Sequence, residues 1–128
     1  MLRRTLGLCL AALVLTGCVA AGEPSVEYIG VPTQPAEPGG GACMDALAGG
    51  TIVDDPRWGI ALAQNDGSRL EVVWPAGYVA RRSGSVLELV DGDGRAVARA
   101  GDRVTVAGGM GAGDAWWACG APQLAAAP

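Results

Sequence analysis

Closely spaced turn signals restrict this chain to short strands. The sequences NDGS at 65–68, GDG at 92–94 and GD at 101–102 each separate two runs in which apolar residues recur at alternate positions. Asp and Gly in this setting adopt the backbone conformations that tight hairpin turns need. Such signals recur roughly every ten residues, which is typical of small barrels and sandwiches. The pattern predicts an all-β domain of six to seven short strands, folded as a small, partly open barrel of OB-like or SH3-like type.

The expected strands lie between these turns and the prolines. They cover residues 50–54, 58–64, 69–74, 86–90, 95–99, 103–106 and 115–119. The 21 glycines and 8 prolines of the 128-residue chain also favour turns over long helices.

The opening segment has the layout of an export signal. Arg3 and Arg4 precede an apolar run at 6–15, which is shorter than the roughly 20 residues that a bilayer span needs. The run is apolar on all sides, unlike the amphipathic helix of a soluble domain. The sequence LTGC that ends at Cys18 resembles the lipobox of bacterial lipoproteins.

This resemblance implies that residues 1–17 are a signal peptide and that Cys18 becomes the lipidated first residue. The expected location is the extracytoplasmic face of the cell membrane, with the acyl chains on Cys18, palmitate among them, as the anchor. An ordinary signal peptide followed by an incidental Cys18 is the alternative.

Residues 18–41 have the composition of a tether, because they contain four prolines and end in three glycines. A short strand at 26–31 that docks on the domain is the alternative for part of this segment. The barrel domain is expected at 42–120 and a disordered tail at 121–128.

Two cysteines remain for the folded domain. Cys9 leaves with the signal peptide and Cys18 is the proposed lipid site, so Cys43 and Cys119 form an even pair in an oxidising compartment. We expect a disulfide that closes the domain end to end, with a stabilisation of ~4.5 kcal/mol in the chain-entropy model. A metal site is not expected, because the chain has no His and two thiols are too few ligands.

A second resemblance covers about 70 residues. The motifs at 73–78 (VWPAGY), 89–94 (LVDGDG) and 98–104 (ARAGDRV) resemble pieces of small exported β-barrel domains found in actinobacterial lipoproteins. That family has no established activity. The resemblance therefore implies a fold and a compartment and adds no chemistry.

Charge and composition exclude several functions. Once residues 1–17 are removed, seven arginines face thirteen carboxylates, so no nucleic-acid partner is expected. Without His or Lys no hydroxyl can be activated as a nucleophile. The sequence DGDG at 91–94 lacks the spacing of an EF-hand calcium loop, and no cofactor is expected. The alternative to a non-catalytic protein is a small carboxylate-dependent hydrolase or an accessory enzyme subunit, with Asp54–Asp55 or Glu71–Glu88 as acid and base.

The candidate binding surface consists of large rings. It comprises Trp74, Tyr78, Trp116 and Trp117. The alternative for Trp74 and Tyr78 is a hydrophobic plug at the end of the barrel. Trp116 and Trp117 are neighbours on a strand, so one is expected in the core and the other outside. The sequence thus predicts a binding or scaffolding module for an envelope protein or a glycan.

Another candidate is the basic pair Arg81–Arg82. This pair could contact an anionic headgroup or a glycan. The alternative is two turn residues in water.

Overall fold

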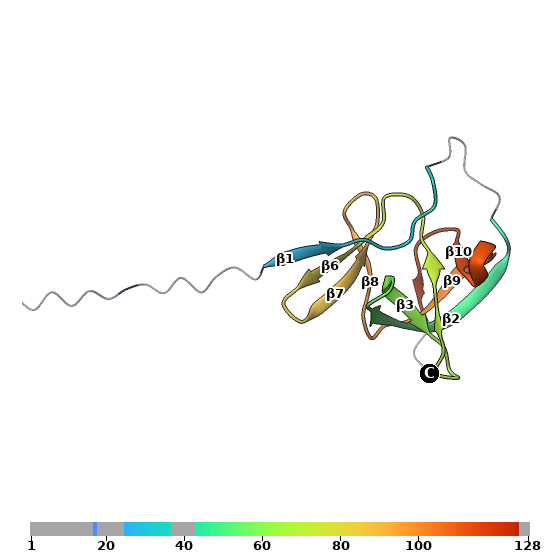
Figure 1. The fold of residues 1–128 in the computed structure, drawn as a ribbon, viewed down its shortest axis with the longest axis horizontal. Helices are drawn as coiled ribbons and strands as arrows, with labels where there is room; N and C mark the ends of the chain where they lie inside the picture. Colours follow the sequence, from blue (N-terminus) through green and yellow to red (C-terminus); the bar gives the residue numbers. More distant parts are fainter. Residues whose placement is uncertain (1–16, 18–24, 37–42, 126–128) are drawn as a thin grey trace, which may run out of the picture.

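The computed structural model describes residues 17, 25–36 and 43–125, and their fold is all-β, as predicted (Figure 1). The strands are β1 (Val26–Ile29), β2 (Ala46–Asp55), β3 (Gly59–Ala63), β4 (Arg69–Leu70), β5 (Val72–Val73), β6 (Val79–Ser83), β7 (Val86–Val90), β8 (Ala96–Arg99), β9 (Arg103–Met110), β10 (Trp116–Ala118) and β11 (Gln123–Leu124), with one short 3-10 turn, η1 (Ala112–Asp114). No helix in these residues is long and apolar enough to cross a membrane.

The larger sheet is a nearly closed barrel. Its strands follow the order β4-β3-β2-β9-β10-β5, and β11 adds to β9. The pairs are antiparallel except for β10 with β5, which is parallel. Only Glu71 separates β4 from β5, so the two ends of the strand order are consecutive in the chain. This arrangement confirms the predicted barrel.

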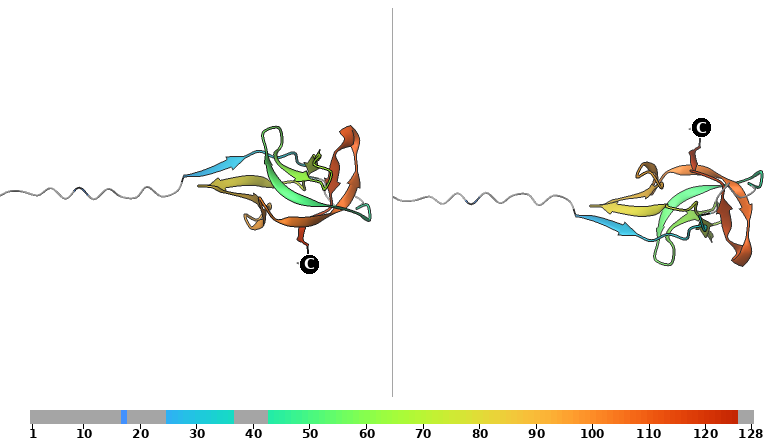
Figure 2. Two further views of the ribbon diagram at one scale, coloured as in Figure 1. Left: turned by 90° about the horizontal axis from the view of Figure 1, so that it is seen from below. Right: turned by 90° about the horizontal axis from the view of Figure 1, so that it is seen from above.

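A second sheet projects from the barrel. Its order is β1-β6-β7-β8, and all its pairs are antiparallel. Gly101, which follows β8, donates a backbone hydrogen bond of 2.8 Å to Ile52 of β2 and so joins the sheet to the barrel. In both views of Figure 2 the hairpin β6–β7 and β1 form one end of the molecule, and β10 lies towards the other.

One core runs through both sheets. Its largest fully buried side chains are Trp74, Ile52, Ile60, Leu62, Leu89, Val72, Val104 and Val106. Alternation explains this set, since every second residue of a strand points to the same face. Leu87 and Leu89 of β7 extend the core under the second sheet.

The domain begins earlier than its predicted boundary at residue 42. β1 pairs with β6, and Thr33 forms a parallel bridge with Trp74. Of the two readings of residues 18–41, the docking strand is therefore correct for 26–29, and the tether prediction is wrong for 25–36. The physical reason is that Ile29 and Val31 pack against the core, which outweighs the turn-forming effect of the prolines.

The predicted tail at 121–128 also starts too early. β11 pairs with Thr105 and Val104 of β9, and Ala125 donates a 2.8 Å backbone hydrogen bond to Arg103. The unpaired edge of β9 offers these partners, which the composition of the tail does not reveal. Residues 126–128 lie outside the described part of the chain.

Two strands differ from the expected pattern. The run at 69–74 is divided at Glu71, because Leu70 pairs with β3 whereas Val72 pairs with β10. Arg81 and Arg82 lie in β6 and not in a turn. Both arginines form ion pairs there, which allows charged residues to occupy a strand between two others.

Candidate binding groove

The Cys43–Cys119 disulfide is present, as predicted, with its Cα atoms 5.4 Å apart. It joins the segment before β2 to the end of β10. Both cysteines are solvent-exposed, so the bond lies at the surface and not in the core. Met44 is thereby held beside β10, and its backbone carbonyl faces Cys119 Sγ at 3.9 Å.

A groove of about 800 Å³ surrounds this disulfide. Four separate parts of the chain form it, namely the segment after Thr33, the segment before β2, the turn after β5, and the β9–β10 hairpin. Its lining residues are Gln34, Pro35, Ala36, Cys43, Met44, Pro75, Ala76, Gly109, Met110, Gly111, Trp117, Ala118 and Cys119. This volume is in the range of sites that bind small molecules or a few side chains.

Two glycines make room for the apolar side chains of the groove. A Cβ atom on Gly109 would collide with Met44, and one on Gly111 would collide with the indole of Trp117. The Met44 and Trp117 side chains therefore lie directly on backbone. These contacts hold both side chains in place, whereas Met110 is half exposed at the end of β9.

Trp116 and Trp117 lie on opposite faces of β10. Trp116 is 7 % exposed and belongs to the core, whereas Trp117 is 37 % exposed and lines the groove. The prediction that one ring is inside and the other outside is correct. Of the four predicted rings, Trp117 is the one that the structure brings to the groove.

Trp74 and Tyr78 form a stacked pair in and beside the core. Trp74 is fully buried, and Tyr78 stacks on it with ring centroids 6.2 Å apart and planes 3° apart. Burial, together with the negative charge of Asp91, raises the pKa of Tyr78. The plug interpretation is correct for this pair, and the binding-surface prediction is wrong for Trp74 and Trp116. The reason is the docked segment around Thr33, which covers the strand that Pro75 ends.

Sequence reasoning missed Gln34. Its side-chain Nε2 donates hydrogen bonds to the carbonyl oxygens of Val73, at 3.0 Å, and Ala118, at 2.6 Å. It thus fastens the docked segment to β5 and β10. A lone Gln among prolines has no sequence pattern that would single it out.

Among the described residues that line it, the groove carries no ionisable side chain apart from the two bonded cysteines. The described residues as a whole have seven arginines and eleven carboxylates. The described lining is therefore uncharged and mainly apolar, on an acidic protein. Its polar side-chain groups are the Trp117 indole N–H and the Gln34 amide, whose Nε2 already donates to two backbone carbonyls.

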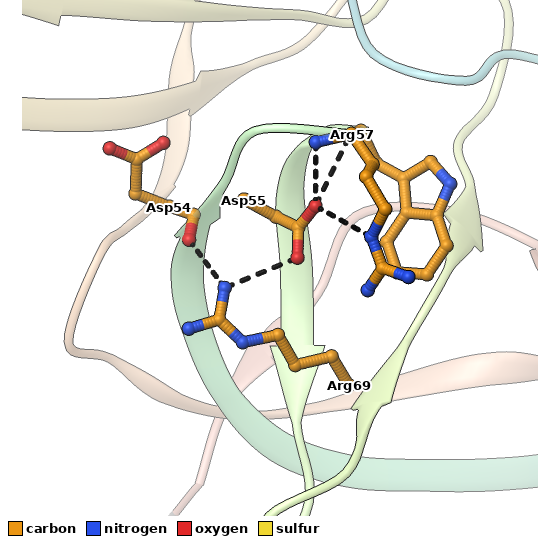
Figure 3. Close-up of polar contacts among 5 residues, drawn as sticks. Asp54, Asp55, Arg57 and Arg69 are labelled. Atoms are coloured by element: carbon orange, nitrogen blue, oxygen red, sulfur yellow. Dashed lines mark hydrogen bonds and ion pairs between the residues drawn. The ribbon is translucent and has the colours of Figure 1, made fainter.

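The most buried carboxylate belongs to a turn. Asp55 is 2 % exposed, and one of its oxygens accepts hydrogen bonds from the backbone N–H groups of Arg57, at 2.8 Å, and Trp58, at 3.3 Å (Figure 3). The other oxygen pairs with Arg69 Nη1 at 3.1 Å. Burial raises the pKa of Asp55, but the hydrogen bonds from Arg57 and Arg69 outweigh it and hold the pKa below its ordinary value of 3.8.

The proposed acid–base pairs are occupied by arginines. The Asp54 carboxylate points away from Asp55 (Figure 3) and pairs with Arg82 at 2.9 Å. Glu88 lies between Arg81, at 3.2 Å, and Arg99, at 3.3 Å. Glu71 belongs to the barrel and Glu88 to the second sheet, so these two carboxylates lie on different sheets.

The DGDG sequence forms a hairpin turn. Asp91 Oδ1 accepts hydrogen bonds of 2.9 Å from the backbone N–H groups of both Asp93 and Arg95. Across the described ranges no group of three or more His, Cys, Asp or Glu side chains could hold a metal ion.

Comparisons of this chain with models of protein families, with curated proteins and with solved structures gave no match. Residues 1–16 of the signal peptide predicted at 1–17, and the predicted lipid site at Cys18, lie outside the described residues.

Proposed function

We propose that this protein is a lipid-anchored, extracytoplasmic binding module without chemistry of its own. In this proposal Cys18 carries the lipid, and the groove around the Cys43–Cys119 disulfide takes an uncharged, apolar peptide segment of an envelope protein. The anchor is supported by the lipobox resemblance. The compartment is supported by a surface disulfide, which a reducing cytosol would not preserve.

The observation that carries the binding proposal is Trp117 on the floor of the groove. A partly exposed Trp, flanked by the exposed side chains of Met44 and Met110, is costly in water and is typical of protein-binding surfaces. Met side chains adapt to the shape of a partner. The gain from burying these three side chains is available only when a partner covers them.

The same side chains favour an apolar peptide over a glycan. A sugar needs several polar side chains that can bind its hydroxyl groups. Among the described lining residues only the Trp117 indole N–H and the Gln34 amide are of this kind, and the Gln34 Nε2 already donates to Val73 and Ala118. An acidic peptide would gain no ion pair from the described lining, which contains no arginine. An uncharged segment with large apolar side chains fits these conditions.

The test is selection of peptides from a displayed random library on the folded, oxidised protein. Dissociation constants of the selected peptides are then compared for the unchanged protein, Trp117→Ala and Leu47→Ala. Leu47 is the matched control, since it is an exposed apolar residue of β2 outside the groove. Trp117→Ala should weaken binding by over ~1 kcal/mol, about fivefold or more, whereas Leu47→Ala should leave it unchanged.

The composition of the selected peptides is the second readout. Apolar, uncharged sequences support the proposal. Selected peptides that are consistently charged, or whose binding ignores Trp117→Ala, contradict it. A glycan array read with the same variants covers the other class of ligand, and Trp117-dependent glycan binding would replace the peptide by a sugar.

A further inference from the structure

The second sheet has one face that points away from the core. Residues directly opposite one another on neighbouring strands share a face, and two such rows define this one. Val26, Ser83 and Val86 form the first row. Tyr28, Arg81, Glu88 and Arg99 form the second. We call these seven residues the outer face.

The opposite face of the same sheet is core. Ala80, Leu89 and Ala98 lie opposite one another there, and all three are buried. Three apolar side chains of the outer face, in contrast, are exposed, Val26 by 52 %, Tyr28 by 65 % and Val86 by 40 %. The described part of the chain contains nothing that covers them.

Charge also distinguishes this sheet. Its four strands carry three arginines, Arg81, Arg82 and Arg99, against two glutamates, Glu27 and Glu88. The rest of the described chain carries four arginines against nine carboxylates. Arg99 keeps 66 % of its side chain exposed although it pairs with Glu88, so its guanidinium can still meet an anion. On the outer face itself Arg81 and Arg99 stand against Glu88, so this face of an acidic protein carries one more positive than negative charge.

The position of β1 links this face to the proposed anchor. Val26 pairs with Ser83 at the tip of the β6–β7 hairpin, so the start of β1 and the hairpin tip lie together at one end of the molecule (Figure 1). Six residues, 19–24, separate Cys18 from Ser25. Even a fully extended chain places Ser25 within about 25 Å of Cys18.

We infer that the outer face lies against the phospholipid headgroups of the membrane that carries the anchor, with Val26, Tyr28 and Val86 in the interface and Arg81 and Arg99 beside lipid phosphates. This inference rests on the proposed lipidation of Cys18. Tyr and Arg suit such a place, because an amphipathic ring and a long charged stem can keep their polar ends in the headgroup layer. The anchor already holds the domain at the membrane surface, so the contacts of the outer face with lipid form at a high effective concentration. Weak contacts are therefore sufficient.

This contact has a consequence for binding. The hairpin tip and β10 lie towards opposite ends of the molecule (Figure 2), and β10 contributes Trp117 to the groove. The groove therefore lies at the far end of the domain from the hairpin tip that the anchor holds near the bilayer. A partner could then reach the groove without displacing lipid.

The experiment uses the lipidated protein, reconstituted into vesicles of phosphatidylcholine and phosphatidylglycerol whose acyl chains carry bromine. Bromine quenches only indoles that reach the membrane. Tyr28→Trp places an indole on the outer face, and Leu47→Trp places one at another exposed apolar site as the matched control. Both are compared with the unchanged protein, and mass spectrometry of that protein tests the anchor.

The inference predicts that the added indole of Tyr28→Trp is quenched and emits at shorter wavelength than that of Leu47→Trp, which stays unquenched. Adding Val86→Asp to Tyr28→Trp should remove that quenching while the protein stays on the vesicles. If all lipidated variants bind the vesicles but the indole of Tyr28→Trp is not quenched, the face contact is wrong and the anchor stands. If the unchanged protein, purified from membranes, carries no acyl chain on Cys18 by mass spectrometry, the anchor is wrong and the inference that rests on it is overturned as well.

Discussion

The two sides of β10 contain the same kind of side chain in opposite settings. Trp116 points inward and packs with Trp74 and Val72 in the core, whereas Trp117 points outward into the groove beside the disulfide. Inside, an indole contributes stability through the contacts it fills. Outside, the same indole contributes little to folding and is available to a partner. The residue type alone therefore does not show whether an aromatic side chain serves binding or folding. The residues that surround it in the fold determine its role.

The largest expected effect is on the core side. Trp74→Ala and Trp116→Ala should each lower the free energy of unfolding by about 3–5 kcal/mol, because each leaves a large cavity. Trp117→Ala should cost less than about 1 kcal/mol, since its ring is partly in water already. Urea denaturation of the three variants measures this difference. Equal losses of stability in the three variants would show that Trp117 contributes as much to folding as the two core indoles, which would contradict this account.

Removal of the disulfide tests whether peptide binding in the groove can be lost while the domain stays folded. The double variant Cys43→Ser/Cys119→Ser should lower stability by about 2–4 kcal/mol, and the same loss should follow from reduction. The free segment at Met44 no longer covers Gly109, so peptide binding in the groove should fall more than the folded fraction does. Thermal melts and peptide affinity below the melting temperature separate the two effects. Unchanged affinity in the folded double variant would exclude the Met44 side from the binding site.

The buried carboxylate of Asp55, which lies away from β10, is predicted to stabilise the turn that follows β2. Asp55→Ala removes two backbone hydrogen bonds and the ion pair with Arg69, and should cost about 1–3 kcal/mol. Because folding lowers the pKa of Asp55, its contribution is complete above the unfolded-state value near 3.8 and is lost as the pH falls through the folded-state pKa.

The control for this prediction is Asp93→Ala, which changes an exposed turn carboxylate and should cost under ~0.5 kcal/mol. The free energy of unfolding should differ less between pH 7 and pH 2 for Asp55→Ala than for the unchanged protein, because the lowered pKa of Asp55 contributes to that difference. An equal pH dependence in both proteins would contradict the role given to Asp55.

Much of the fold could be predicted because turn residues act locally. The Asp-Gly turns at 91–94 and 101–102 define β7, β8 and β9 whatever surrounds them. β6 was missed because Arg81 and Arg82 look like loop residues until Glu88 and Asp54 supply their partners across the sheet. Such pairings depend on contacts between distant parts of the chain, which periodicity does not reveal.

The site shows the same limit. The disulfide followed from counting cysteines, and the division between Trp116 and Trp117 followed from strand alternation. Trp74 was misplaced because the segment that covers it, around Thr33, resembles a linker in composition. Gln34 and Gly111 could not be predicted for the same reason, since their roles exist only where four separate segments meet.

The most direct test of the central claim is to locate a bound peptide on the protein. A selected peptide that carries a photoreactive group is cross-linked to the folded, oxidised protein, and the modified residues are identified by mass spectrometry. We expect the cross-links on Met44, Met110 and Trp117, and their loss when unlabelled peptide competes. Cross-links that are confined to the β6–β7 hairpin or to β11, with Met44, Met110 and Trp117 unmodified, would contradict the assignment of the groove as the binding site.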